Sequence, residues 1–498
     1  MNSGPATDPE NLEFRNIRMS KTPAILWFRN DLRIEDNPAL FAARESGHPV
    51  IPVFILDDNI EHAPGGANRW WLHHSLASLA SDLEKAGVKL ILRRGDSKKV
   101  LHGLVDETQA SQVFWNRRYH NSQIEIDKAL KSELTDHGVS VETFNGNLLR
   151  EPWEVKTGSG GSYRVYTPFW KSLRAMGPAR NEPLPRIRKI NSPDAAPKSD
   201  KLTSWRLLPS KPDWASEFPT EWTPGEQGAR DRLNDFLNEP VAHYSDGRNR
   251  PDFDYTSKLS PHLAFGEISP TKIWHVTQDR IASGEITQSS AEKFLSEIAW
   301  REFSYNLLFY NHQMPTTPLR SEFANYPWRN DEQALVAWQK GQTGYPIIDA
   351  GMRQLWRTGW MHNRVRMIVA SFLIKDMLIN WQDGAEWFWD TLVDADLANN
   401  SASWQWVAGC GADAAPYFRI FNPVTQGEKF DPNGDYVRKY VPELAKMPAK
   451  YIHAPWKAPQ EILEKANVSL GKNYQKPFLD HSQARQRALD GYAKIRQN

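Results

Sequence analysis

Polar side chains alternate with tryptophan and methionine between residues 359 and 430, where an ordinary core would be rich in leucine. The segments concerned are GWMHNRVRM, DADLANNSASWQW and APYFRIFNPVTQGEKFD. One set in helical register, at i, i+3, i+4 and i+7, consists of Trp360, Asn363, Arg364 and Met367. This spacing predicts that the four side chains share one face of a helix. Such a face indicates either a cavity for a polar ligand or a helix edge at a domain boundary.

A second set with the same spacing consists of Glu297, Trp300, Arg301 and Ser304. A carboxylate on a buried helix face is costly unless it is hydrogen-bonded. The set therefore predicts a second wall of the same pocket or, alternatively, an exposed i, i+4 ion pair between Glu297 and Arg301. Two such helices in one region of the chain favour the pocket.

Two shorter signals concern charged groups. The hydroxyl-rich segment Thr256–Ser260 precedes a helix expected to start near Ser269. Small hydroxyls and exposed backbone N–H groups suit phosphate binding, although most such turns only cap helices. Arg366 is expected to point away from the first helix face and to pair with Asp394 or Asp396.

Three tryptophans complete the candidate chemistry, and they are Trp404, Trp381 and Trp328. They are either core aromatics or members of an electron-hopping chain, because indole is among the most easily oxidised side chains. The sequence contains no HExxH, Walker or GxSxG motif and no zinc-ligand spacing. Any chemistry is therefore expected to belong to a bound cofactor, and no metal site is predicted.

The composition indicates a cytoplasmic protein of at least two domains. A chain of 498 residues is too long for one core. With 61 basic and 60 acidic residues, nucleic-acid binding must depend on a local patch rather than on net charge. The single cysteine, Cys410, excludes a disulfide framework and a cysteine-held iron–sulfur cluster. No apolar run could span a bilayer or serve as the core of a signal peptide.

The elements that must position these residues fall into two classes. Residues 22–153 are expected to form an α/β domain with a doubly wound parallel sheet, because short apolar runs alternate with helical patterns such as Trp70–Ala86 and Ser122–His137. The predicted strands are Ala24–Phe28, Val50–Leu56, Val88–Arg93, Gln112–Asn116 and Val139–Phe144. No GxGxxG follows any of them, so a dinucleotide-binding Rossmann domain is only weakly supported.

The other segments differ in character. Residues 1–21 are predicted to be a mobile tail, in which Met19 is an alternative start, and residues 154–222 an interdomain linker that wraps a surface. Residues 223–498 are predicted to form an all-helical domain. Its expected helices include Gly225–Leu237, Ser289–His312, Glu332–Lys340, Ile347–Thr358, His362–Asn380 and Gly384–Leu392.

Several of these segments together resemble the photolyase/cryptochrome family, from about residue 22 to 460. They are WFRNDLRIEDNPAL, YTSKLSPHLAFGEISP, FLSEIAWREF, GYPIIDAGMRQL, TGWMHNRVRM and the stretch from 394 to 431. The resemblance implies an α/β domain followed by a helical domain that holds a U-shaped FAD.

The resemblance also implies the FAD contacts by position. They are Tyr244, Thr256, Ser257, Lys258, Leu259, Ser260, Arg301, Arg366, Asp394, Asp396 and Asn400. Within this set, Arg366 and Asp394 correspond to an ion pair beside the isoalloxazine. Asn400 corresponds to the residue facing flavin N5, where an amide suits the anionic reduced flavin. Trp404, Trp381 and Trp328 match the three-tryptophan chain that reduces oxidised flavin in light, and Trp387 and Trp389 are candidates for a side branch or for packing.

The substrate pocket implied by the resemblance is that of a cyclobutane pyrimidine dimer photolyase. Its members are Glu297, Trp300, Asn363, Met367 and Trp406. Glu297 is expected to hydrogen-bond the dimer bases, the two tryptophans to stack on the dimer, and Met367 to pack over it. The implied DNA contacts are Arg248, Arg364, Arg419 and Gln426, whose charges suit phosphate binding.

The implied activity is light-dependent repair of these dimers in DNA, by electron transfer from photoexcited reduced FAD to a dimer flipped out of the duplex. The alternatives are a cryptochrome-type blue-light receptor and a (6-4) photolyase. The first is disfavoured by Asn400, where plant or insect receptors have Asp or Cys, and by a chain that ends soon after the family core. The second is disfavoured by Met367, where (6-4) enzymes have a histidine.

Many family members carry a second, antenna chromophore, which makes methenyltetrahydrofolate the first candidate here. Where folate-binding members have an Asn–Glu pair, this chain offers Ser122 and Gln123. A variant folate site, a deazaflavin, a second flavin and an empty pocket therefore all remain open. The expected partner is DNA that contains pyrimidine dimers, without a membrane or an obligate protein partner, and the protein is expected to be a monomer.

Overall fold

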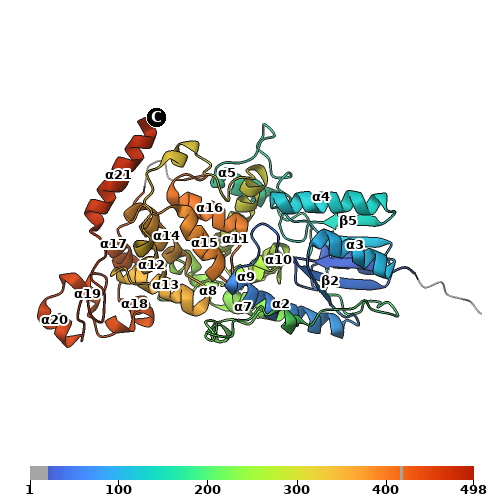
Figure 1. Cartoon of the computed structure of the whole chain (residues 1–498), viewed down its shortest axis with the longest axis horizontal. Helices are drawn as coiled ribbons and strands as arrows, with labels where there is room; N and C mark the ends of the chain where they lie inside the picture. Colours follow the sequence, from blue (N-terminus) through green and yellow to red (C-terminus); the bar gives the residue numbers. More distant parts are fainter. Residues whose placement is uncertain (1–20, 415–418, 498) are drawn as a thin grey trace, which may run out of the picture.

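The computed structural model describes residues 21–414 and 419–497 of the chain. The predicted mobile tail lies almost wholly outside the described residues, as do residues 415–418 of the APYFRIFN segment. An α/β domain occupies one end of the molecule and a helical domain the other (Figure 1). The C-terminal helix α21, His481–Gln497, lies on the side of the helical domain that faces away from the sheet (Figure 1).

The sheet of the α/β domain is parallel throughout and confirms the doubly wound prediction. Its strand order is β3-β2-β1-β4-β5. The strands are β1 Ala24–Phe28, β2 Val50–Leu56, β3 Ile91–Arg94, β4 Gln112–Asn116 and β5 Ser140–Phe144. The third strand starts three residues later than predicted, at Ile91 rather than Val88. Every residue of β1 and β2 is buried, as expected of strands covered on both faces.

Helices cover both faces of the sheet. They are α1 Pro38–Glu45, α2 Gly66–Lys85, α3 Ser97–Thr108 and α4 Asn121–Asp136. Leu26 packs with α1 and α2, whereas its neighbour Ile25 packs with α3 and α4. Successive side chains of a strand point to opposite faces, so this division follows from the alternation along β1. Asn37 and Asp96 cap the N-termini of α1 and α3.

The connection between the domains is ordered and partly helical. Within residues 154–222 lie α5 Tyr166–Met176, the 3₁₀ helix η1 Leu202–Trp205 and α6 Phe218–Glu221. Ile187, Ile190 and Trp205 are buried in the core of the α/β domain. The segment therefore wraps around the α/β domain, and most of its prolines lie in the stretches that run across the surface.

The second domain is helical over its described residues. Its elements are α7 Glu226–Asn238, α8 Pro240–Gly247, α9 Ser260–Ala264, α10 Pro270–Ala282, α11 Gln288–Tyr310, η2 Ser321–Asn325, α12 Glu332–Gln339, α13 Pro346–Thr358, α14 Asn363–Ser371, η3 Phe372–Asp376, α15 Trp381–Thr391, α16 Leu397–Ala408, α17 Pro423–Phe430, α18 Asp435–Tyr440, η4 Pro442–Leu444, α19 Ala449–Ile452, η5 Pro455–Lys457, α20 Gln460–Lys465 and α21. In residues 21–414 and 419–497, no helix combines the length and apolar character needed to cross a membrane.

One predicted helix, His362–Asn380, is wrong in its extent. The α-helix ends at Ser371, and the chain continues as the π-helix η3. Leu378 then adopts φ 57°, in the left-handed region, which stops helical propagation before α15. The apolar pattern runs on unbroken through this segment because η3 is itself buried.

The two domains share a core and a set of hydrogen bonds. Trp222 and Trp360 of the helical side belong to the same buried cluster as the sheet residues. The Asn68 side chain donates to the carbonyls of Leu392 and Val393, both at 3.2 Å. These contacts fix the α/β domain against the end of α15 and therefore hold the interdomain geometry.

Glu302 of α11 is buried at this junction and accepts hydrogen bonds from the backbone N–H groups of Leu149 and Arg150. Burial raises its pKa from 4.5 to about 7, although Arg301 opposes the shift. Because the pKa is higher in the folded protein, protonated Glu302 contributes to the free energy of unfolding. This contribution is complete below pH 4.5 and is lost as pH rises through 7.

We therefore expect Glu302→Gln, which stays neutral, to gain stability relative to wild type as pH rises from 4.5 to about 8, by on the order of 3 kcal/mol. Thermal unfolding of both proteins across this pH range measures the difference. A difference in Tm that does not change with pH would show that Glu302 is ionised in the fold.

Asp349 joins three separate segments of the helical domain. Its carboxylate accepts from Thr343 N and Oγ1, both at 2.7 Å, from Gly344 N and from the Tyr474 hydroxyl at 2.8 Å. Asp349→Ala leaves these buried donors without an acceptor, and we expect the free energy of unfolding to fall by about 3 kcal/mol or more. Urea unfolding checks this value. Asp349→Asn keeps one acceptor oxygen and is expected to lose less; equal losses would contradict the hydrogen-bond explanation.

Candidate active site

A cavity of about 160 Å³ lies in the helical domain, beside the hydroxyl-rich segment before α9. Thr256 and Lys258 line one wall, and Trp360 and His362 line another. Lys258 has φ 50°, and its ammonium group lies 2.8 Å from Asp254. Trp360 Nε1 donates to Ser260 Oγ at 3.3 Å, so the segment and the opposite wall touch. The predicted helix near Ser269 is preceded by a nearer one, α9, which starts at Ser260.

His362 is a site residue that the sequence patterns did not reveal. Its Nδ1 accepts from Arg364 N at 3.2 Å and caps α14. Its Nε2 is buried and has no hydrogen-bond partner among the described residues. Burial, helped by the charges of Arg364 and Arg366, lowers the pKa of His362 to about 3. His362 therefore lines the cavity with a neutral imidazole ring.

The prediction that Trp360 shares a helix face with Arg364 is wrong. Gly359 adopts φ 65° and ends α13, and α14 begins only at Asn363. Trp360 thus lies in the turn between two helices and reaches the cavity from there. The signal that could have placed it was the glycine itself, which is the usual residue after a helix end.

Within α14, Arg364 and Met367 do lie together. Arg364 Nη1 is 3.5 Å from Met367 Sδ, and the guanidinium carbon is 4.5 Å from the ring centroid of Phe430. Arg364 Nη2 also donates to Asn249 Oδ1 at 2.7 Å. Asn363, the first residue of the helix, is exposed. The structure therefore places the predicted DNA residue Arg364 in contact with the predicted substrate residue Met367. Asn363 lies at the exposed edge of this pair.

Arg366 pairs with Asp394, one of its two expected partners. The pair is bidentate, with nitrogen–oxygen distances of 3.1 and 2.8 Å. The Asp394 side chain is almost completely buried, and Arg366 Nε is held by the Met361 carbonyl at 2.7 Å. This geometry gives the charge-assisted hydrogen bonds a fixed direction.

Asp396 serves a different group. It caps α16 through the N–H of Asn399 at 2.9 Å and accepts from the Tyr305 hydroxyl. Arg301 is buried, donates to the Asn147 carbonyl at 2.7 Å and lies over the Tyr305 ring at 4.7 Å. Burial and the nearby Asp396 carboxylate raise the pKa of Tyr305 well above its ordinary value, so the phenol keeps its proton.

Asn400 follows one turn after Asp396, on α16. Its Nδ2 donates to the Ala385 carbonyl of α15 at 3.0 Å. This contact orients the amide between two helices. Its predicted place facing flavin N5 stays a prediction.

Glu297 pairs with Arg248 of the α8 end, and Lys293 lies 3.6 Å from the same oxygen. The alternative of an exposed Glu297–Arg301 pair is wrong, because Arg301 is turned inward to Asn147. Arg248 also lies 6.0 Å from the ring centroid of Tyr244. Tertiary contacts thus bring three predicted site residues into one group. They are Tyr244, predicted to contact the cofactor, Arg248, predicted to contact DNA, and Glu297, predicted to contact the substrate.

Trp300 lies beside this group, on the same helix as Glu297. Its ring is stacked on Tyr166 with a centroid distance of 3.7 Å and an angle of 7°. The Tyr166 hydroxyl donates to the Ser296 carbonyl, which holds the tyrosine in place. Because Trp300 remains partly exposed, its position suits stacking against a further flat group.

Three of the predicted DNA contacts form a positively charged cluster. Burial lowers the pKa of Arg364, and the charges of Arg248 and Arg419 lower it further. Like charges that approach this closely favour a bound anion such as phosphate. Trp406 and Arg419 line a small hollow of about 20 Å³ together with Phe421. Gln426 is partly buried on α17.

The three candidate tryptophans belong to one hydrophobic cluster. Trp404 packs so closely on α15 that a Cβ at Gly384 would lie 2.1 Å from its ring. Trp381 is one turn before Gly384 and is buried. Trp328 is only partly buried and packs against the same cluster, with its ring 4.4 Å from that of Tyr326. Trp404 and Trp381 are thus buried, and Trp328 lies nearer the surface of the same cluster.

Comparisons with known proteins agree with this geometry. Residues 24–188 match the family model described as DNA photolyase, and residues 294–494 match the FAD binding domain of DNA photolyase. A deoxyribodipyrimidine photo-lyase of Agrobacterium fabrum is 53% identical over 96% of this chain and 99% of its own length. The chain belongs to the DNA photolyase family.

Structural comparison supports the same assignment. The crystal structure of a bacterial class III photolyase from Agrobacterium tumefaciens superposes with a TM-score of 0.94, at 53% identity, covering 97% of this chain and 100% of the other. Cryptochrome-1 of Arabidopsis thaliana is 39% identical over 95% of this chain and 70% of its own length. The expected two-domain fold, an α/β domain and a helical domain, is confirmed.

The helical domain is an FAD-binding domain, and its residues fit that cofactor. The cavity joins hydroxyls and an ammonium group, which suit a pyrophosphate, to aromatic side chains and to the His362 ring. The roles assigned to single residues toward FAD and DNA stay predictions.

Proposed function

We propose that this chain uses light to split cyclobutane pyrimidine dimers in DNA. The observation that carries this proposal is the near full-length similarity to a deoxyribodipyrimidine photo-lyase, combined with the Glu297–Arg248 and Trp300–Tyr166 group at the protein surface. Bound in its reduced form, FAD supplies the electron for the photochemical step. The chain's own residues bind the DNA, hold the dimer and position the cofactor.

The arginine cluster binds the backbone of damaged DNA. Arg248, Arg364 and Arg419 contact phosphates, and Gln426 adds a neutral contact. These contacts depend on salt and carry no sequence information. A dimer is already distorted, so flipping it out of the duplex costs less than flipping normal bases.

The flipped dimer is received by the partly exposed residues of α11, α14 and α16. Trp300 and Trp406 present ring faces for stacking, and Met367 packs over the pair. Glu297 accepts hydrogen bonds from the dimer bases, and Asn363 adds an amide at the edge. In this position the dimer excludes water from the arginine–carboxylate pairs around it.

Inside the domain, the hydroxyl-rich segment from Thr256 to Ser260 holds the phosphates and ribose, together with Tyr244. The pair Arg366–Asp394 and the group of Arg301 and Asp396 fix the flavin ring, with Asn400 beside it. Their fixed geometry avoids reorganisation when charge moves.

Further features extend the proposal. The protein acts as a monomer in the cytoplasm, without an obligate protein partner. For the antenna position on the α/β domain, methenyltetrahydrofolate is the first candidate, and a deazaflavin, a second flavin and an empty pocket are the alternatives. The Ser122 hydroxyl, at the first of the two antenna positions, lies 3.1 Å from His120 Nδ1 and is therefore already engaged by a neighbouring side chain.

The test is repair of a duplex that contains one thymine dimer by purified, reduced protein, in blue light and in darkness. Light-dependent restoration of normal thymines supports the proposal. No repair by FAD-loaded protein that still binds the duplex would overturn it. Parallel samples with a (6-4) lesion separate the alternative photolyase from a cryptochrome-type receptor, which repairs neither.

A further inference from the structure

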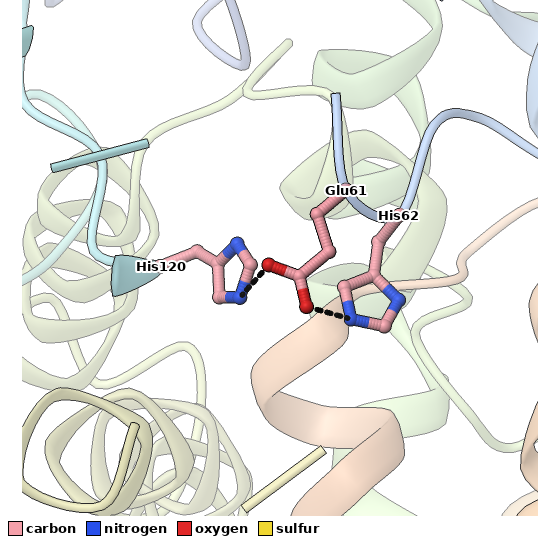
Figure 2. A group of neighbouring side chains, drawn as sticks. All are labelled: Glu61, His62 and His120. Carbon is pink, nitrogen blue, oxygen red and sulfur yellow. Dashed lines mark ion pairs between the residues drawn. The ribbon is translucent and has the colours of Figure 1, made fainter. Parts of the chain in front are cut away.

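A cluster of two histidines and a glutamate lies outside the residues that the proposed function uses. Glu61 and His62 belong to the segment between β2 and α2, and His120 is the residue before α4. Figure 2 shows the Glu61 carboxylate between the two imidazole rings. In residues 21–414 and 419–497 this is the one group of three or more such side chains with ligand atoms within 4.8 Å of one another.

The cluster occupies a favourable place in the sheet topology. The segments after β2 and β4 both leave the carboxyl edge of the parallel sheet, on either side of β1. The winding of the sheet reverses at β1, and ligands of open α/β sheets bind at this edge, beside such a reversal. Residues from the two segments therefore converge there without any sequence proximity.

The distances suit a shared ion better than direct hydrogen bonds. His62 Nε2 lies 3.7 Å from one Glu61 oxygen, and His120 Nε2 lies 3.8 Å from the other. Both separations exceed hydrogen-bond length. Ligands held tetrahedrally at about 2.0–2.1 Å from Zn²⁺ are roughly 3.3 Å apart, so each histidine nitrogen needs to approach the carboxylate by about half an ångström, and all the ligand atoms already lie within 4.8 Å of one another.

The backbone and one unsatisfied nitrogen point to the same role. His62 adopts φ 58°, in the left-handed region, which lets two consecutive side chains face the same point. Its Nε2 is buried and has no hydrogen-bond partner among the described residues. A buried ring nitrogen of this kind needs a partner, and a metal ion supplies one.

Neighbouring contacts hold the ligands in place. His120 Nδ1 lies 3.1 Å from Ser122 Oγ, which leaves Nε2 as the nitrogen for a metal. Trp389 of α15 packs edge-on against His62 at 5.8 Å, and its Nε1 donates to the Ala63 carbonyl at 2.9 Å. Gly66 N also donates to Asp390 Oδ1 at 2.7 Å. The segment that carries two ligands is thereby fixed to the helical domain.

We propose that Glu61, His62 and His120 bind one divalent transition-metal ion of the zinc type at the domain junction. Two imidazoles and one carboxylate favour Zn²⁺ over Mg²⁺ and Ca²⁺, which take oxygen ligands. Three protein ligands leave a fourth position for water or another donor. The bound ion joins the segments after β2 and β4 and tightens the segment that contacts α15.

The test uses the full, untagged chain with FAD bound, freed of metal by a chelator and gel filtration. Titration with ZnCl₂ in the calorimeter is expected to show one equivalent bound per chain, and Tm is expected to rise with Zn²⁺. MgCl₂ and CaCl₂ at the same concentration are expected to give neither signal. No saturable Zn²⁺ binding by the wild-type chain would overturn the proposal, whatever the variants do.

Variants locate the ion. His62→Ala and His120→Ala are each expected to weaken Zn²⁺ binding by at least about tenfold. Glu61→Gln changes a side chain that is 55% exposed, so the fold tolerates it, and it is expected to weaken binding as well. The matched control is His102→Ala, which removes a histidine from another pair on the same domain, with Glu133 at 2.9 Å.

The control is expected to bind Zn²⁺ like the wild type. Equal Zn²⁺ affinity in wild type and Glu61→Gln, or loss of binding in His102→Ala alone, would place the ion elsewhere and overturn the assignment. Failure of dimer repair would leave these results unaffected, because the cluster shares no residue with the proposed repair site.

Discussion

Replacing Trp404 with phenylalanine is expected to abolish light-driven reduction of the oxidised flavin almost completely. Phenylalanine is far harder to oxidise than tryptophan, so the first donor in the chain is lost. Repair by protein that has been chemically reduced beforehand is expected to stay near the wild-type level, because that reaction needs no donor from the protein. Absorbance of the flavin during blue illumination, with an external reductant, measures the first effect, and dimer repair measures the second.

The structure shows that this substitution is tolerable. Trp404 packs edge-on against Phe388 at 4.9 Å and fills the space above Gly384. A smaller ring leaves a cavity that costs about 1–3 kcal/mol, which is too little to unfold a domain of this size in most cases. Retention of FAD after gel filtration confirms that the site is intact before the kinetics are compared.

A matched pair of variants tests the direction of the chain. Trp381 and Trp338 both lie near Trp404, and Trp338 is 6.4 Å away by ring centroid. Trp338 is completely buried and donates to the Val369 carbonyl, so it offers no exit to solvent. We expect Trp381→Phe to block photoreduction and Trp338→Phe to spare it. The reverse result would show that the second step runs through Trp338.

Replacing Glu297 with alanine is expected to lower dimer repair and at the same time to strengthen binding to undamaged DNA. The carboxylate is proposed to accept hydrogen bonds from the dimer, and losing a charged acceptor costs about 1.5–3 kcal/mol, or roughly 10- to 100-fold in selectivity. The same carboxylate neutralises Arg248 in the free protein. Without it, one more cation is available for phosphate, so the salt dependence of binding should steepen by about one phosphate contact.

Glu297→Gln separates the two effects. The amide keeps an acceptor oxygen of the same reach but removes the charge. We expect the steeper salt dependence in both variants and the loss of selectivity for the dimer mainly in the alanine variant. Binding titrations over a range of salt, with dimer-containing and undamaged duplexes, provide both numbers. Release of FAD from Glu297→Ala would instead show that this side chain supports the cofactor.

Local patterns were sufficient for most of the fold. Apolar runs such as Val50–Leu56 match a strand residue for residue, because a strand covered on both faces must be apolar throughout. Helices such as α13 were predicted to within one residue, because their ends carry a proline and a glycine. The prediction failed where burial hides the end of a helix, as at Ser371, since a buried π-turn is as apolar as the helix before it.

The candidate site was harder to predict from spacing. The helical register correctly grouped Arg364 with Met367, four residues or fewer apart on one helix. It wrongly added Trp360, which a turn brings near from outside the helix, and it missed His362, whose importance lies in an unpaired nitrogen. Helical register predicts only which side chains are neighbours on one helix. Whether a polar atom lacks a hydrogen-bond partner depends on every element packed around it.

The sequence by itself determined the family, the two-domain fold and the pairing of Arg366 with an aspartate, because specific motifs and local periodicity carry that information. Only the tertiary structure decided which partner each charged residue takes, as in Glu297 with Arg248, and which distant residues meet, as in Glu61 with His120. The physical reason is that ion pairs and ligand clusters form between side chains far apart in the chain, and their distances are set by how the sheet, the wrapping segment and the helices pack together.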